Sequence, residues 1–548
     1  MATGTTEGRS GAAGGKLKRE VSTIGLLFVC LGSVIGSGWL FGALYAVQVA
    51  GPASMISWVL GAGVMLLLAL CHAEVGGMYP VAGGSTRYPQ FAFGSLAGFA
   101  SGWIVWVGAV TVAPIEVEAA LQYLTHYFHW LTSTTAGATV LTPAGIVISV
   151  ILLAIFTAIN ILGVAQLAKS NNAIMVWKIA IPFLAVAVIM ILQFKASNFT
   201  AADGFAPTGI QGVLSAIAIG GIIFSYQGFE QAIQFGGETH NPERNIPLAV
   251  LGSIAIGAVL YILLQLAFIG ALSPENFKNG WENISFSGDA GPFAGLATTL
   301  GASWLAVLLY IDAAVSPAGT GLIYSATSAR LSFSLSRSGY IPAVFGRISN
   351  RGVPIVSIIF AFFVGCIMFL PFPGWQQLVG FIISATVMGY AMIPLAFGAL
   401  RRQVPDARRP FKLPAGEVLA PIAFIVANLV IYWTGWEILW KLLAAIALGF
   451  VLLALAYFTN QERASLDWKS GSWLFPYFVG LGLLSYIGPE DFQGIGLIPF
   501  GIDIVVMAVF SLAIYYYAIS VRLTPEEVRG HVAESREESE EEEQELAV

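Results

Sequence analysis

Two apolar stretches are each interrupted at mid-length by small and polar residues: Gly32-Ser33-Val34-Ile35-Gly36-Ser37-Gly38, and Gly220-Gly221-Ile222-Ile223-Phe224-Ser225-Tyr226-Gln227-Gly228. Inside a membrane, a backbone N–H or C=O without a hydrogen bond costs several kcal/mol, so non-helical backbone survives there only where it lines a cavity or meets a ligand. A matched pair of such breaks is typical of transporters and predicts a solute site near the middle of the membrane.

The composition indicates an all-α polytopic membrane protein. Of 548 residues, 57% are hydrophobic and only 10% are charged, against about 25% charged in a soluble domain. About 14 apolar runs are long enough to cross roughly 30 Å of hydrocarbon. We predict spans at residues 21–50, 52–73, 96–125, 143–163, 172–194, 212–236, 249–272, 303–325, 353–370, 375–399, 417–434, 437–458, 472–488 and 499–520.

Basic residues give the orientation, because Lys and Arg in short loops favour the cytoplasmic side. An even number of spans puts both termini on one side. If both are inside, the cytoplasmic segments hold most of the Lys and Arg, and the outer loops keep only Lys195 and Lys278. We therefore predict a multi-pass protein of the cell membrane with both termini cytoplasmic.

The two breaks fall in spans one and six, which predicts a five-plus-five inverted repeat with broken helices 1 and 6. The predicted organisation is a cytoplasmic N-terminal segment at 1–20, a transporter core at 21–400 with inverted repeats at 21–194 and 212–400, additional helices 11–14 at 401–520, and a disordered acidic cytoplasmic tail at 521–548. The tail is predicted to be disordered because residues 534–545 contain eight Glu and almost nothing that packs.

The chain resembles the amino acid–polyamine–organocation transporters over spans one to ten. The resemblance is carried by the first glycine break, by Glu74 to Gly84, by Gly228-Phe229-Glu230 followed by Glu238 and by residues 241–247, and by Ser328-Ala329-Arg330 with residues 337–342. The fourteen-span form is most similar to the branch of acidic amino acid–proton symporters. Trp39 is bulkier than the usual residue after the break, which leaves the substrate open.

The break in span one suits an amino acid. The N–H groups that start the second half-helix carry the positive end of its dipole and suit a carboxylate, whereas the carbonyls that end the first half-helix accept bonds from an ammonium. The predicted substrate-binding residues are Ser33, Val34, Ile35, Gly36, Ser37, Gly38, Phe224, Ser225, Tyr226, Gln227 and Gly228. The resemblance implies that the Phe224 ring covers the solute. The alternative is that these glycines only allow close helix packing.

Lys178 lies inside span five, where a charged lysine costs about 2.5 to 3.5 kcal/mol. The resemblance implies proton coupling, because a lysine here takes the place of a sodium ion in sodium-coupled relatives. The alternative is a structural lysine that stays bonded to carbonyls of the broken first span.

Three acids are secondary candidates for proton coupling or for binding a cationic group. Glu116 and Glu118 lie in span three, about 200° apart around the helix, so they do not share a cavity. Asp312 begins a polar stripe with Ser316 and Thr320 on span eight, which is predicted to face span one. Pairing of each acid with Lys178 or a backbone N–H is the alternative.

We predict a secondary active transporter that imports amino acids by proton-coupled alternating access, with an amino acid, the proton and the lipid bilayer as partners and no nucleic acid. The alternatives are a proton-independent amino acid or polyamine exchanger and a membrane solute sensor. No enzyme is predicted, because the chain lacks a phosphate-binding loop of the Gly-x-x-x-x-Gly-Lys type. The three cysteines and five histidines show no metal-binding spacing, so no metal or cofactor is predicted.

Overall fold

The computed structural model describes residues 21–81, 84–135, 138–162, 165–234, 236, 239–284, 286, 291–349, 353–372, 374–459 and 466–546. The predicted N-terminal segment at 1–20 and Glu238 of the family motif lie outside the described residues.

Every predicted span contains helix. Ten helical stretches in the described chain are long and apolar enough to cross a membrane, and four shorter apolar helices accompany them. The helices of the predicted core are α1 (Thr23–Val34), α2 (Gly38–Ala50), α3 (Ser54–Met78), α5 (Ser95–Leu124), α6 (Pro143–Leu162), α7 (Ala165–Leu192), α8 (Gly209–Ile219), α9 (Ile222–Ser225), α10 (Gln231–Gln234), α11 (Pro242–Ala271), α13 (Ser303–Arg337), α14 (Ile355–Met368) and α15 (Trp375–Gln403). The additional helices are α16 (Gly416–Trp433), α17 (Trp436–Thr459), α18 (Leu474–Ile487) and α19 (Ile502–Ser520).

Short elements fill the connections. They are α4 (Gly84–Phe93), α12 (Pro292–Thr299), η1 (Gly51–Ala53), η2 (Ala196–Thr200), η4 (Pro274–Phe277), η5 (Trp281–Asn283), η6 (Ala343–Gly346) and η7 (Glu490–Phe492). One antiparallel hairpin, β1 (Thr132–Thr135) with β2 (Ala138–Leu141), pairs Thr132 with Leu141. The sequence did not predict this hairpin; the other described elements are helices, as the all-α prediction expects.

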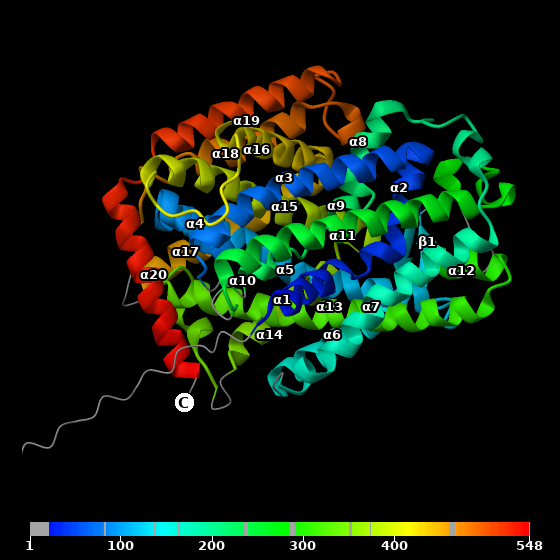
Figure 1. Ribbon diagram of the computed structural model, residues 1–548, viewed down its shortest axis with the longest axis horizontal. Helices are drawn as coiled ribbons and strands as arrows, with labels where there is room; N and C mark the ends of the chain where they lie inside the picture. The colour runs from blue at the N-terminus through cyan, green and yellow to red at the C-terminus, as the bar shows by residue number, and fades with distance from the viewer. Residues whose placement is uncertain are drawn as a thin grey trace, which may run out of the picture.

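Helices α5 and α15 form the centre of the molecule. Their most apolar windows are each 94% buried, whereas those of α6 and α17 are 22% and 28% buried. Since α6 is also the most apolar of the long helices, its exposed surface suits lipid rather than water. In Figure 1 the long helices run roughly side by side along the horizontal axis, and α16, α18 and α19 lie together along one side.

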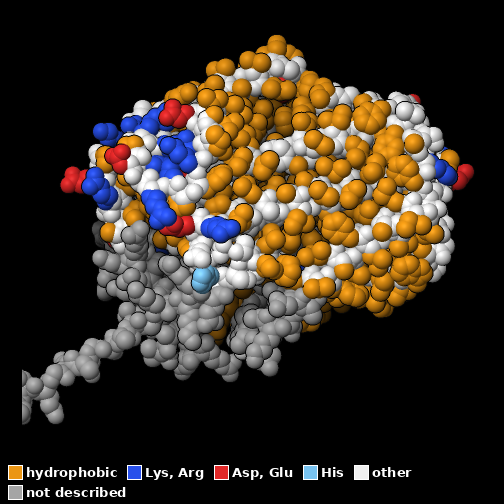
Figure 2. Space-filling view, in the orientation of Figure 1, with side chains coloured by type: hydrophobic (Ala, Val, Ile, Leu, Met, Phe, Trp, Pro, Cys, Tyr) orange, Lys and Arg blue, Asp and Glu red, His pale blue; other side chains and the backbone are white. Residues whose placement is uncertain are grey.

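Most of the charged side chains visible in Figure 2 gather at one end of this bundle, and a few lie at the other end. Figure 2 shows Lys and Arg clustered at the left end, near the end where Figure 1 places α4 and α20, and a broad hydrophobic surface beside them. This separation of charge from apolar surface is typical of a multi-pass membrane protein.

Both predicted breaks are interruptions of helix. Helix α1 ends at Val34 and α2 begins at Gly38, and α8 ends at Ile219 before the single turn of α9. The second break continues through turns at 226–230 before α10. Gly221 and Gly228 have φ values of +82° and +121°, which favour glycine because a Cβ is strained there.

The prediction of a disordered tail at 521–548 is wrong, because residues 525–546 form helix α20 (Pro525–Leu546). Thr524 and Glu527 cap its first turn: the Thr524 N–H donates to Glu527 Oε2 at 2.7 Å and the Glu527 N–H to Thr524 Oγ1 at 3.4 Å. Val528 is fully buried and Val532 is 9% exposed. Two valines four residues apart therefore give this acidic helix an apolar face, and the helix packs against α4.

Candidate functional site

The two breaks pack directly against each other. A Cβ on Gly228 would lie 2.7 Å from the Ser33 carbonyl carbon and from the Val34 nitrogen, and one on Gly38 would lie 2.6 Å from Ser225 Oγ. Real Cβ atoms do not approach so closely. Glycine at these positions therefore lets the backbone of one break touch the other, although almost two hundred residues separate them.

The carbonyl end of the first break binds Lys178. Its Nζ donates to Gly32 O at 2.6 Å and to Thr320 Oγ1 at 2.8 Å. Tyr261 donates its hydroxyl to Val34 O at 2.8 Å. Carbonyls that lost their helical partners at the end of α1 are thus bonded by side chains of α7, α11 and α13, as a break at this depth requires. The polar stripe predicted on span eight does face span one.

The amide end of the same break binds Glu116 of α5. The Ser37 N–H donates to both carboxylate oxygens, at 2.9 Å to Oε2 and 3.2 Å to Oε1. Trp375 of α15 donates its indole N–H to Ser37 Oγ at 2.9 Å. A carboxylate at the first amides of α2 is stabilised by the helix dipole, so the position that we predicted for a substrate carboxylate holds a carboxylate of the protein.

Glu230 organises the second break. It accepts from the Gly228 N–H at 2.9 Å and from the Tyr390 hydroxyl at 2.5 Å on Oε2, and from the Tyr324 hydroxyl at 3.0 Å on Oε1. One buried carboxylate therefore joins the break to α13 and α15. Three charge-assisted donors compensate its burial.

A small cavity lies where the breaks meet. It is lined by Ser33, Val34, Gly36, Val112, Glu116, Phe224, Gln227, Thr320 and Tyr324. The space open to the centre of a water molecule is about 10 Å³, roughly what one water needs. Ser33 Oγ and Gln227 Nε2 are buried without a hydrogen-bond partner among the described residues. The cavity thus offers unpaired polar groups, but helices must move before it admits an amino acid.

The other predicted substrate-binding residues do not line this cavity. Ser37 and Gly228 act through their backbone N–H groups, while Ile35, Gly38 and Ser225 pack within or between the breaks. The Tyr226 ring stacks edge-on against Trp58 and Tyr261, and its hydroxyl donates to Trp58 O at 3.4 Å. Tyr226 therefore supports the break from behind.

The proton-coupling candidates separate in space. Lys178 and Glu116 bind opposite ends of the first break. Asp312 accepts from the Trp177 indole at 2.8 Å and from Ser316 Oγ at 2.7 Å. Glu118 is 1% exposed, lies outside the cavity and has no hydrogen-bond partner among the described residues. Within the described chain, no acid lies within 4.0 Å of the Lys178 ammonium as an ion pair.

Several residues of the site were not predicted. Val112, Tyr324, Tyr390 and Trp375 are ordinary apolar-helix residues in the sequence, and only a three-dimensional arrangement brings them to the breaks. Glu230 belongs to the motif that carries the family resemblance, but the sequence predicted no role for it. Its position just after a glycine break could have indicated that this acid binds the backbone of the break.

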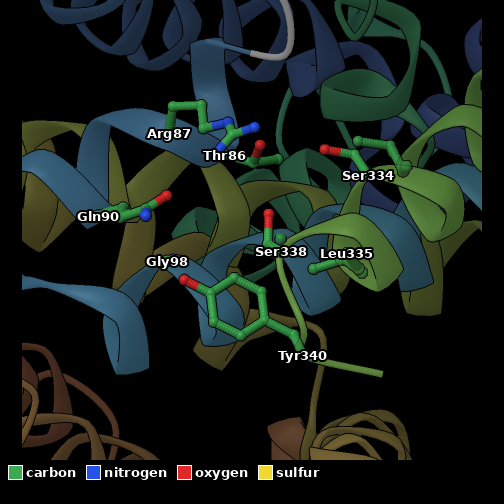
Figure 3. Close-up of a pocket in the computed structure, with 10 residues that line it drawn as sticks. Thr86, Arg87, Gln90, Gly98, Ser334, Leu335, Ser338 and Tyr340 are labelled. Carbon is green, nitrogen blue, oxygen red and sulfur yellow. The ribbon is translucent and has the colours of Figure 1, made fainter. Parts of the chain in front are cut away.

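A second cavity lies further along α5 and α13. It is lined by Thr86, Arg87, Gln90, Gly98, Gly102, Leu331, Ser334, Leu335, Ser338 and Tyr340. Figure 3 shows the side chains of Arg87, Gln90, Ser338 and Tyr340 around it. On α5, Gly98 lies fourteen residues from Val112 of the first cavity, and on α13, Ser334 lies fourteen residues from Thr320 of the first cavity. This spacing places each pair on nearly the same face of its helix, about 20 Å apart along the helix axis. One face of each helix therefore lines both cavities.

No group of three or more His, Cys, Asp or Glu in the described part of the chain is placed to hold a metal ion. Broken helices around a small polar cavity need no such group to bind a solute.

Comparison with known proteins agrees with this geometry. The amino acid permease family matches residues 21–484. The chain belongs to the amino acid permease family. The permease is 39% identical over 514 residues to the glutamate/serine transporter AimA of Bacillus subtilis (strain 168), covering 92% of this chain and 94% of that protein. It is 34% identical over 508 residues to the aspartate-proton symporter of the same organism, covering 92% and 96%.

More distant relatives include the branched-chain amino acid permease BcaP of B. subtilis, 25% identical over 459 residues that cover 82% of this chain and 94% of that protein. The permease is thus a multi-pass membrane transporter of the amino acid–polyamine–organocation superfamily and not an enzyme.

Proposed function

We propose that the permease imports acidic or small polar amino acids across the cell membrane together with protons, by alternating access. The observation that carries this proposal is the pairing of two broken helices around one polar cavity, with a lysine ammonium at one end of the first break and a carboxylate at the other. The names of two relatives, a glutamate/serine transporter and an aspartate-proton symporter, support the substrate class and the coupling ion.

Lys178 is the proposed proton-coupling residue. Among the described residues, its ammonium donates to a carbonyl and a hydroxyl and forms no ion pair within 4.0 Å. A neutral amine can accept one hydrogen bond and still donate, so loss of the proton leaves the Thr320 contact intact. Opening of the site to either side then allows Lys178 to exchange its proton with that side. Asp312, which interacts electrostatically with Lys178, is the proposed secondary acid.

The proposed organisation follows the sequence. Inverted repeats at 21–194 and 212–400 form the transporting core, and helices 11–14 at 401–520 cover one side of it. Both termini are proposed to be cytoplasmic, because the basic cluster lies at the end that carries α4 and α20. The second cavity, at that same end, is then the proposed inner section of the substrate route.

Reconstitution tests the proposal. Purified permease in proteoliposomes is given labelled L-glutamate, L-aspartate, L-serine, L-arginine or putrescine, with acid outside and neutral pH inside. We expect L-glutamate, L-aspartate or L-serine to accumulate in vesicles that contain no substrate, and a protonophore to abolish accumulation. Uptake that requires substrate inside the vesicles and is unaffected by the protonophore would support the alternative, a proton-independent exchanger. Uptake of arginine or putrescine alone would contradict the substrate class.

A further inference from the structure

The amide end of the first break is already filled by the protein. Glu116 is 1% exposed, and both of its carboxylate oxygens accept from the Ser37 N–H, at 2.9 and 3.2 Å. A Cβ on Gly36 would lie 2.5 Å from Glu116 Oε1. The absence of a side chain at position 36 therefore leaves the space that this carboxylate uses.

The same position is where the carboxylate of an amino acid binds in the proposed function. Ser37 supplies the N–H that precedes α2, and the positive end of the helix dipole lies beside it. Glu116 lines the cavity, and the remaining space accommodates about one water molecule. Glu116 and a substrate carboxylate thus require the same N–H and the same volume, and two carboxylates in that volume repel each other.

We propose that Glu116 is a tethered competitor of the substrate: its carboxylate occupies the substrate's carboxylate site until a proton displaces it. This inference rests on the proposed proton symport, and it makes Glu116 a second group, beside Lys178, that takes up and releases a proton in each transport cycle. A proton taken from the side that the site faces neutralises Glu116, which removes the charge that the Ser37 N–H and the dipole stabilise. The substrate carboxylate then replaces it, so the helix end binds one negative charge in both states. When the substrate leaves, Glu116 returns the proton to the other side and rebinds Ser37.

The groups around Glu116 are consistent with exchange of one carboxylate for another. Lys178 of α7 interacts with it electrostatically, and its ammonium is bonded at the opposite end of the break. Tyr261 of α11 and Tyr324 of α13 also interact electrostatically with Glu116. The Tyr261 hydroxyl donates to Val34 O, and the Tyr324 hydroxyl donates to Glu230. Asp312 interacts with Lys178 and is bonded by Ser316 and Trp177. None of these groups donates to Glu116, so Ser37 is its described hydrogen-bond partner.

The competition predicts how substrate binding depends on pH. Because Glu116 must bind one proton for each substrate that binds, the apparent dissociation constant rises about tenfold per pH unit once Glu116 is ionised in the free protein. Glu116→Gln cannot ionise and holds Ser37 only through a neutral amide. We expect this variant to bind substrate at high pH as tightly as the wild type does at low pH, with little dependence on pH.

The experiment is a binding titration of purified full-length permease with L-glutamate, L-aspartate and L-serine from pH 5 to pH 8.5. Glu118→Gln is the matched comparison, because Glu118 is equally buried, belongs to the same helix and lies outside the cavity. We expect it to keep the wild-type slope. Glu116→Asp keeps the acid but shortens it by one methylene, so we expect tighter binding than wild type at high pH with some slope remaining.

A Glu116→Gln protein that keeps the wild-type slope would overturn the inference, and so would one that is folded by its melting temperature but binds no substrate at any pH. If Glu116→Gln does not fold, Glu116→Asp decides in the same way: binding no tighter than wild type at high pH contradicts competition. Failure of the proposed function is a different result, namely wild-type protein that binds none of the three amino acids or that accumulates none under a pH gradient.

Discussion

At Gly228 the backbone has a φ of +121°, and a Cβ would lie 2.7 Å from two backbone atoms of the first break. Gly228→Ala must therefore strain the backbone at residue 228 and push the two breaks apart. Overpacking of this kind lowers the free energy of unfolding by about 1 to 3 kcal/mol or more. We expect a lower melting temperature and at least a tenfold loss of uptake.

Gly63 is the matched control for Gly228. It lies in helix α3, and apart from its chain neighbours and the nearby backbone of that helix, no described atom lies within 4 Å of the Cβ that alanine would add. Since alanine is the better helix former by about 1 kcal/mol, Gly63→Ala should keep or raise the melting temperature. Equal melting temperatures for the two variants would contradict the close contact of the breaks.

Lys178 is the residue on which the proposed coupling depends. Lys178→Ala removes the ammonium from Gly32 O and Thr320 Oγ1, so we expect no accumulation under a pH gradient, with some exchange of internal for external substrate. Lys178→Arg keeps a positive charge that does not titrate and should also fail to accumulate substrate. Accumulation by Lys178→Ala at the wild-type level would eliminate the coupling role.

At the scale of elements, Glu74 of α3 holds the end of α15 and the loop that follows. The Arg401 Nη2 atom lies 2.6 Å from Glu74 Oε2, the Leu413 N–H donates to the same oxygen at 2.6 Å, and Arg409 Nε lies 3.3 Å from Oε1. Glu74 is 1% exposed. Loss of one partner of a buried pair costs about 3 to 5 kcal/mol, because a charge stays buried.

Arg401→Ala is therefore expected to lower the melting temperature clearly. Arg401→Lys should lower it less than Arg401→Ala does but still below the wild-type value, because lysine cannot bind Glu74 through two nitrogens. The exposed pair between Lys278 and Glu275, at 2.9 Å, is the control, and Lys278→Ala should change nothing measurable. A melting temperature of Arg401→Ala equal to that of wild type would show that Arg409 and the Leu413 N–H suffice for Glu74.

Helix α20 depends on the cap at its start. The Thr524 N–H and hydroxyl donate to Glu527 and lower the pKa of that carboxyl. The bonded form is thus the charged one, so its contribution is complete above the ordinary glutamate pKa and is lost as the pH falls through the lowered value. Thr524→Ala should cost α20 about 1 kcal/mol.

Hydrogen exchange of residues 525–535 measures this loss at neutral pH. We expect faster exchange in Thr524→Ala and unchanged exchange in α5 and α15, because the described side-chain hydrogen bonds of the cap join Thr524 to Glu527 and involve neither of those helices. Identical exchange of residues 525–535 in variant and wild type would show that Val528 and Val532 hold the helix without its cap.

For the whole molecule, the sequence predicted where apolar helices lie, because apolar length is a property of the chain itself. All fourteen predicted spans contain helix, and the positions of both breaks follow from glycine and serine within apolar runs. Helix α13 continues to Arg337, twelve residues beyond its predicted span. The residues at that end are too polar to count toward an apolar span, but they still form helix. Hydropathy therefore predicts the apolar part of a helix and not the residue at which the helix ends.

The tail and the site show what a single sequence does not contain. Eight Glu in residues 534–545 predicted disorder, but two valines outside that run are buried, and α20 packs against α4. Glu116 was one of three candidate acids, and only the structure shows that it reaches the Ser37 N–H while Glu118 does not line the cavity. Partners far apart in sequence depend on packing, which local patterns do not report.

A structure of the permease with saturating L-glutamate or L-aspartate, determined by cryo-electron microscopy at acid pH, tests the central claim most directly. We predict a solute that contacts both breaks at once, through residues 33–38 on one side and Phe224 or Gln227 on the other. A solute bound elsewhere, with residues 32–38 and 220–228 still closed on each other, would contradict the claim that the two breaks form one transport site.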